Sequence, residues 1–241
     1  LDEFTEALID FAAVFVPEPP RSVKPDRTLA FLLVSDGQEY NLLDFEVGAR
    51  TIDDELYAEK AGIKPSELVK LVEETKYGLI YLSGVPGSGK TSLIYHLTKV
   101  VKKRFVFIPH SQLRIFQETE NLMQLFELLK NCVLIIEDAE GLFKKRDENT
   151  VGGVQSFLLN ATDGFLAEAL GCLIILTQNM TENIDSAFLR AGRLVKHCQF
   201  NALPFDQAII AATKLKRTAP TDNKDYSLAE IYALPMIEGA T

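Results

Sequence analysis

The chain has 241 residues, 47% of them hydrophobic, which suffices for the core of one large domain or of one domain with a small appendage. With 25 basic and 34 acidic residues its net charge is −9, which disfavours sequence-independent binding of nucleic acid over a broad face. No apolar stretch reaches the ~18 residues that a membrane span needs, and no signal peptide is visible. We therefore expect no membrane span in this chain.

The three cysteines lie in or beside apolar runs and form no CxxC pair, and the three histidines are scattered. This distribution favours small buried thiols over disulfides or metal ligands. It predicts a cytoplasmic location or another reducing compartment.

The first 75 residues predict an N-terminal appendage. Phenylalanines recur at helical spacing over residues 1–16, which predicts an amphipathic helix, and the proline-rich residues 17–25 predict a linker. The deletion of such a segment would be expected to spare nucleotide binding and to change assembly.

The rest of the appendage is predicted to contain β-structure. Two apolar runs, residues 29–34 and 40–45, flank an Asp-Gly turn signal and predict a hairpin. Further on, Ser66 is a candidate cap for a helix over residues 67–74.

From residue 76 to residue 202 short apolar runs alternate with amphipathic segments. This alternation is typical of a parallel sheet with helices on both faces, in which ligands bind at the carboxyl ends of the strands. The predicted strands cover residues 79–82, 105–108, 132–136, 173–176 and 194–200. The predicted helices lie over residues 92–101, around 122–129 and 154–158, and over 184–189.

Two short helices, over residues 208–214 and 227–234, are predicted after this core. We interpret residues 203–241 as a partial helical lid. The expected fold class is therefore α/β, with a partial lid, a small N-terminal appendage and, because the glycine-rich sequence GVPGSGKT follows the first core strand, a P-loop NTPase core.

The strongest motif is GVPGSGKT at residues 84–91, which matches the phosphate-binding P-loop, G-x-x-x-x-G-K-[ST]. It follows a predicted strand and precedes a predicted helix, as this motif requires. Glycines let the backbone wrap around a phosphate, and the N–H groups at the helix start face the anion. The predicted ATP-binding residues are Gly84, Val85, Pro86, Gly87, Ser88, Gly89, Lys90, Thr91 and Ser92. Lys90 would contact the β and γ phosphates, and the Thr91 hydroxyl would ligate Mg²⁺.

Two acids follow the third core strand, in VLIIED. A P-loop ATPase needs one carboxylate near Mg²⁺ and a second that polarises the attacking water. We assign Glu137 to the metal and Asp138 to the water. A solvated acidic turn would be the better interpretation of these acids if no P-loop preceded them.

Asn179, which follows the fourth core strand, is expected at the same edge of the sheet. Its amide can hydrogen-bond the attacking water or the γ-phosphate without competing for Mg²⁺. On its own it would equally indicate a turn-forming asparagine.

Arg190 and Arg193 lie in IDSAFLRAGR, after the predicted short helix. Arginine suits the stabilisation of a transferring phosphoryl group. The alternative is a surface helix whose cations complement its dipole.

Taken in order, GVPGSGKT, VLIIED, TQN and ID-x-A-x-LR-x-GR resemble the motifs of the AAA ATPase family, over roughly residues 50–241. The Glu-Asp order and the segment VQSFLLNATDGF resemble the clade of the mitochondrial inner-membrane chaperone that translocates the Rieske iron–sulfur protein. The resemblance implies self-association into a ring, a hexamer or heptamer, in which Arg190 and Arg193 act on a neighbour's nucleotide. It also implies a macromolecular client, most simply a protein.

The sequence departs from the family pattern at several points. Ala191 stands where a proline usually follows the first arginine, and no acid follows the second. The lid ends early by family standards. Phe116 is a candidate for a central-pore aromatic, although a buried helical residue fits its apolar context better.

Three functions remain open. The first is Mg²⁺-dependent ATP hydrolysis in a ring that remodels or translocates its client. The second is a nucleotide-gated switch or scaffold with slow hydrolysis, because Asp138 is one methylene shorter than the usual glutamate. The third, a small-molecule phosphotransferase, is disfavoured by the arginines after the Asn179 strand, and a GTPase by the absence of N-K-x-D.

Overall fold

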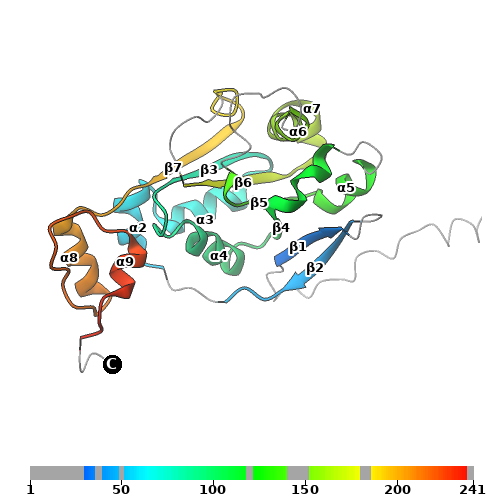
Figure 1. The fold of residues 1–241 in the computed structure, drawn as a ribbon. Coiled ribbons are helices and arrows are strands. Elements are labelled where there is room, and N and C mark those ends of the chain that lie inside the picture. The colour runs from blue at the N-terminus through cyan, green and yellow to red at the C-terminus, as the bar shows by residue number, and fades with distance from the viewer. Residues whose placement is uncertain are drawn as a thin grey trace, which may run out of the picture.

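The computed structural model describes residues 30–35, 40–48, 52–117, 122–139, 152–179 and 186–237, and Figure 1 shows their arrangement. The helix and linker predicted over residues 1–25 lie outside these residues. Within the described chain, seven strands form one sheet in the order β2-β1-β4-β5-β6-β3-β7. The strands are β1 (Ala30–Ser35), β2 (Tyr40–Phe45), β3 (Gly78–Gly84), β4 (Arg104–Ile108), β5 (Cys132–Ile136), β6 (Leu173–Gln178) and β7 (Leu194–Phe200).

All neighbouring strands are parallel except β1 and β2. The sheet is thus mixed but mostly parallel, which confirms the predicted α/β class. β3, β5 and β6 are buried along their whole length, as expected for central parallel strands, each of which contains an apolar run.

Helices cover both faces of the sheet because alternate residues of each strand point to opposite sides. Ile80 and Leu82 of β3 belong to one apolar core, whereas Leu79 and Tyr81 belong to the other. The first core also takes in α2 (Asp54–Ala61), α3 (Pro65–Glu74), α4 (Lys90–Val100), α8 (Phe205–Lys214) and α9 (Leu228–Ala233). The second takes in η1 (His110–Gln117), α5 (Leu122–Leu129), α6 (Gly152–Thr162) and α7 (Gly164–Leu170).

The predicted hairpin forms, but it belongs to the central sheet and not to a separate appendage. β1 pairs antiparallel with β2 and parallel with β4 on its other side. Leu33 is buried in one apolar core and Leu32 packs against the other, so β1 is apolar on both faces. A strand of this kind is stable only inside a sheet that is covered on both sides.

Two local predictions are wrong. Ser66 does not cap α3: the helix begins at Pro65, whose ring suits the first helical position, and the Ser66 hydroxyl donates to Asp54 instead. The predicted helix over 184–189 is a series of turns in its described part, where the Leu189 N–H donates to the Ser186 carbonyl.

Two other predictions are confirmed. All three cysteines are buried and free of disulfides, and the Sγ atoms of Cys132 and Cys172 lie 3.6 Å apart, at the starts of the neighbouring strands β5 and β6. Burial raises the pKa of the Cys198 thiol to about 11. Phe116 is buried and its ring stacks on that of Phe157 at 4.3 Å, so it is a core residue.

The contact between the ends of β3 and β7 yields a prediction for stability. Gly84 has φ +135°, and a Cβ built on it would lie 2.0 Å from the Phe200 carbonyl oxygen. Gly84→Ala should therefore lower the free energy of unfolding by more than about 3 kcal/mol, because the strand ends must separate. Gly192→Ala is the matched control: its φ is +94° with nothing within 4 Å, so only backbone strain of about 1–2 kcal/mol applies.

Urea unfolding of the two variants and the parent chain measures the difference. Equal losses of stability would show that the close approach of the two strand ends does not constrain position 84.

Candidate nucleotide site

The P-loop lies at the carboxyl end of β3, between β6 and β7. The Val85 N–H donates to the Phe200 carbonyl at 3.1 Å, which ties the start of the loop to the end of β7. Gly87 has φ +71° and Gly89 has φ +99°, and such backbone conformations favour glycine. α4 begins directly after Gly89, so its first N–H groups lie within the loop.

Lys90 lies inside the loop that precedes it. Only 6% of the residue is exposed, and its Nζ donates to the carbonyls of Gly84 at 2.9 Å and Val85 at 3.1 Å. These contacts hold a positive charge within the ring of backbone groups. A buried cation beside a helix N-terminus forms an electropositive cradle that suits a polyphosphate.

A cavity of about 750 Å³ opens in front of the loop. Six of its lining residues come from the P-loop and the first turn of α4, and three from the ends of β5 and β6: Asp138, Thr177 and Asn179. The cavity thus lies at the carboxyl edge of the parallel sheet, where ligands bind in this architecture. Its volume suits a nucleotide-sized ligand.

The remaining walls of the cavity come from residues that the sequence did not reveal as site residues. Tyr57 of α2 contributes one wall, and its hydroxyl donates to the Gly89 carbonyl at 3.2 Å. α9 contributes another, with Leu228, Ala229, Tyr232 and Ala233. No local motif distinguishes these residues, because they meet the P-loop only after the chain has folded.

The two acids after β5 point to different partners. Glu137 Oε1 accepts a hydrogen bond from the Thr91 hydroxyl at 2.7 Å. Asp138 Oδ1 accepts one from the Asn179 amide at 2.9 Å. The structure thus brings Glu137 to the P-loop and Asp138 to the end of the neighbouring strand.

Asp138 has a left-handed backbone conformation, with φ +52°, which separates the two side chains. Its N–H donates to the Thr177 hydroxyl at 3.0 Å, which holds this conformation at the end of β6. Aspartate tolerates positive φ better than most residues. The short side chain at this position is therefore consistent with the backbone that positions it.

The Thr91 hydroxyl and the Glu137 carboxylate fit Mg²⁺. Both are hard oxygen donors, and they lie within hydrogen-bonding distance of each other at the mouth of the phosphate cradle. When bound, Mg²⁺ would neutralise charge on the phosphates, with further ligands from water and the nucleotide. Within the described residues, no group of three or more His, Cys, Asp or Glu side chains could hold a metal by itself.

The two arginines lie away from this cavity. The Arg193 carbonyl accepts a hydrogen bond from the Leu79 N–H, at the amino end of β3, whereas the P-loop follows the carboxyl end. Roughly 17 Å of strand separates those ends. Neither arginine lines the cavity of its own chain.

The arginines also differ from each other. Arg193 Nη1 donates to the Ala187 carbonyl at 3.0 Å, and its Nε lies 3.6 Å from an Asp163 carboxylate oxygen. Arg193 therefore braces the turn before β7 against the junction of α6 and α7. Arg190 is exposed.

A family model described as "ATPase family associated with various cellular activities (AAA)" matches residues 80–202. An "ATP-dependent zinc metalloprotease YME1 homolog" of Caenorhabditis elegans is 27% identical over 187 residues, or 70% of this chain and 25% of that relative. The "Probable mitochondrial chaperone BCS1-A" of Dictyostelium discoideum is 30% identical over 157 residues, which are 59% of this chain and 36% of that relative. The "26S proteasome regulatory subunit 4 homolog" of the same organism is 29% identical over 158 residues, which are 61% of this chain and 33% of that relative.

The chain thus spans a quarter to about a third of the length of these relatives. They include a chaperone of the clade that the sequence resembles and members of other branches. None of the described helices is long and apolar enough to cross a membrane. The matched region covers about half of the chain and holds the P-loop, both acids, Asn179 and both arginines, and the chain therefore belongs to the AAA family of ATPases.

Proposed function

We propose that this chain binds ATP with Mg²⁺ and hydrolyses it, and that hydrolysis in a ring drives the remodelling or translocation of a protein client. The observation that carries the proposal is that the two acids contact two different lining residues of one cavity. Glu137 contacts Thr91 in the P-loop, and Asp138 contacts Asn179 at the end of β6. One carboxylate can thus serve the metal while the other serves the attacking water.

Each residue has a role that its position supports. Lys90 binds the phosphates, and Thr91 and Glu137 hold Mg²⁺. Asp138 takes a proton from the attacking water, while Asn179 orients the Asp138 carboxylate and senses the γ-phosphate. Tyr57 and α9, which form the remaining walls of the cavity, contact the adenine base of the nucleotide.

The place of the arginines supports a ring. They precede β7 at the amino edge of the sheet and do not line the cavity of their own chain. We propose that Arg190, which is exposed, stabilises the phosphoryl group bound by a neighbouring copy. Arg193 supports the turn that presents Arg190, through Ala187 and Asp163.

The BCS1-A, YME1 and proteasome relatives support a protein client for this chain. The buried, unbonded cysteines support a reducing compartment.

A nucleotide-gated switch is the second candidate. It is favoured by the length of Asp138, which is one methylene shorter than a glutamate and whose carboxylate accepts a hydrogen bond from Asn179 at 2.9 Å. A threading motor should hydrolyse ATP faster when its client is present, whereas the rate of a switch should not change.

Lys90→Ala should weaken ATP binding at least about 30-fold, or about 2 kcal/mol, because it removes the cation held inside the loop. Lys99→Ala is the matched control, since it removes a cation from the exposed last turn of the same helix. Equilibrium titration with ATP and Mg²⁺ measures both. Affinity within a few-fold of the parent in the Lys90 variant would refute the P-loop assignment.

Asp138→Asn should keep ATP binding and lower turnover by about 10²-fold or more, because an amide is a poor general base. Its amide oxygen can still accept the Asn179 hydrogen bond, so the geometry is retained. Glu137→Gln should instead raise the Mg²⁺ concentration needed for half-maximal activity. If Asp138→Asn turns over normally, the general base is another residue.

Arg190→Ala should lower turnover by about 10³-fold or more while ATP binding is retained. Mixing this variant with Asp138→Asn should restore activity, because some interfaces then pair an intact Asp138 with a neighbour's intact Arg190. Mixing Asp138→Asn with Lys90→Ala is the control, since both defects lie in the chain that binds the nucleotide and no interface is complete. If the mixture of Arg190→Ala and Asp138→Asn recovers no activity although mass measurements of the assemblies show that subunits exchange, the arginine does not act in trans.

A further inference from the structure

The start of α9 is hydrogen-bonded directly to the P-loop. The Ala229 N–H donates to the Gly87 carbonyl at 2.9 Å. The two segments are so close that a Cβ built on Gly87 would lie 2.8 Å from Ala229 Cβ and 3.4 Å from Ser227 Oγ. The conformation of the phosphate-binding loop is therefore coupled to the place where this lid helix begins.

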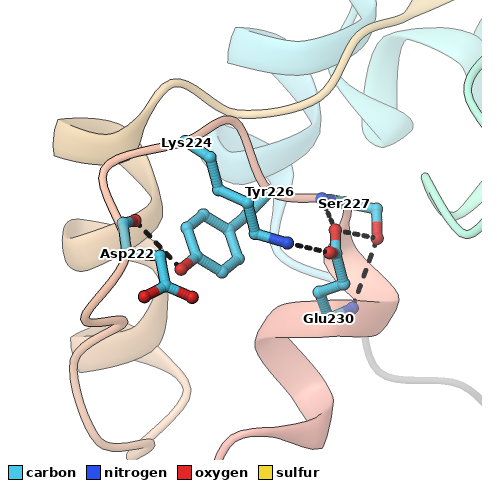
Figure 2. Close-up of polar contacts among 5 residues, drawn as sticks. All are labelled: Asp222, Lys224, Tyr226, Ser227 and Glu230. Carbon is cyan, nitrogen blue, oxygen red and sulfur yellow. Dashed lines mark hydrogen bonds and ion pairs between the residues drawn. The ribbon is translucent and has the colours of Figure 1, made fainter.

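A capping box determines where α9 begins, and Figure 2 shows its contacts. A Glu230 carboxylate oxygen accepts from the Ser227 N–H at 2.8 Å and from the Ser227 hydroxyl at 2.9 Å. The Ser227 hydroxyl oxygen in turn accepts from the Glu230 N–H at 3.3 Å. The two residues thus fix each other's backbone at the helix start.

Lys224 holds the Glu230 carboxylate from the other side. Its Nζ donates to the second carboxylate oxygen at 2.7 Å and lies 4.9 Å from the centre of the Tyr226 ring. The hydrogen bonds from Lys224 and from the Ser227 backbone lower the pKa of Glu230 to about 2. Glu230 is therefore ionised at neutral pH, and the three hydrogen bonds to its carboxylate favour this form.

The cap and the P-loop share the unpaired N–H groups of the helix start. In any α-helix the first N–H groups have no partner within the helix. Here the N–H of Glu230, at the third helical position, donates to its own cap, and the N–H of Ala229, at the second, donates to the P-loop. If the cap is lost and the first turn frays, the donor to Gly87 moves away.

We propose that Glu230 is a positioning residue for nucleotide binding: its carboxylate fixes the first turn of α9 so that the Ala229 N–H holds Gly87, and with it the P-loop, in the conformation that receives the phosphates. The inference rests on the proposed function for its consequence, since a preformed loop matters only if the loop binds a nucleotide. Glu230 does not line the cavity, so we expect it to act on the affinity for the nucleotide through the P-loop and not on the chemical step.

The test compares four variants of the full chain. Glu230→Ala removes the cap, Glu230→Gln keeps the neutral form of the capping box, and Lys224→Met removes only the exposed ion pair. Glu168→Ala is the matched control: this exposed carboxylate also contacts a lysine and a hydroxyl, Lys76 and Tyr77, but lies on α7, away from the P-loop.

We expect Glu230→Ala to raise the Kd for Mg·ADP and the KM for ATP about fivefold, the equivalent of one lost cap of about 1 kcal/mol, with kcat within about twofold. Glu230→Gln, Lys224→Met and Glu168→Ala should each stay within about twofold. A purely structural role would reduce the fraction of active protein and hence kcat, while KM stayed constant. Titration calorimetry and steady-state kinetics separate these outcomes.

Amide hydrogen exchange provides a readout that does not depend on the proposed function. In nucleotide-free protein the Ala229 N–H should exchange about fivefold faster in Glu230→Ala, and at the parent rate in Glu230→Gln. If the parent chain binds no nucleotide, the proposed function fails, and exchange at Ala229 still decides whether Glu230 positions the loop. Unchanged exchange at Ala229, or an unchanged Kd in Glu230→Ala, would overturn the positioning role.

Discussion

The close backbone contact between the end of β3 and the end of β7 constrains the rest of the site. Gly84 leaves no room for a side chain beside the Phe200 carbonyl, and the Val85 N–H donates to that same carbonyl at 3.1 Å. This contact determines where the chain leaves the sheet and where α4 can begin. The cavity, the buried Lys90 and the approach of Glu137 to Thr91 all depend on this one point of departure.

α9, which follows the sheet, and α2, which precedes β3, both contact the P-loop. The Leu203 and Tyr226 backbones exchange two hydrogen bonds of 2.8 Å just beyond β7, and the Ala229 N–H then meets Gly87. On the other side the Tyr57 hydroxyl reaches Gly89. Two glycines of one short loop are thus contacted by two elements that are far apart in the sequence. The P-loop and α9 are therefore linked directly through their backbones.

The fold also separates the two acids from the two arginines. The acids and Asn179 lie at the carboxyl edge of the sheet, whereas the arginines lie at the amino edge, where the Arg193 carbonyl pairs with Leu79. Parallel strands make this separation unavoidable, because residues before a strand and residues after it emerge at opposite edges. A residue that precedes β7 therefore begins at the edge of the sheet opposite the cavity of its own chain.

The sequence by itself determined the residues whose signal is local. The P-loop spacing, the apolar runs of β5 and β6, and the polar residues that come after these runs follow from short stretches of chain, since each depends on neighbours in sequence. Their mutual contacts, Glu137 with Thr91 and Asp138 with Asn179, follow from the rule that parallel strands share one carboxyl edge.

The tertiary structure alone decided which distant segments complete the site. It placed β1 in the central sheet, Tyr57 and α9 on the cavity, and Arg193 against Asp163 while Arg190 is exposed. No hydrophobic period or short sequence motif predicts these contacts, because each joins residues whose separation along the chain is unrelated to their separation in space. Such contacts are selected by the burial of apolar faces and by the backbone groups that remain to be paired, and both are properties of the whole fold.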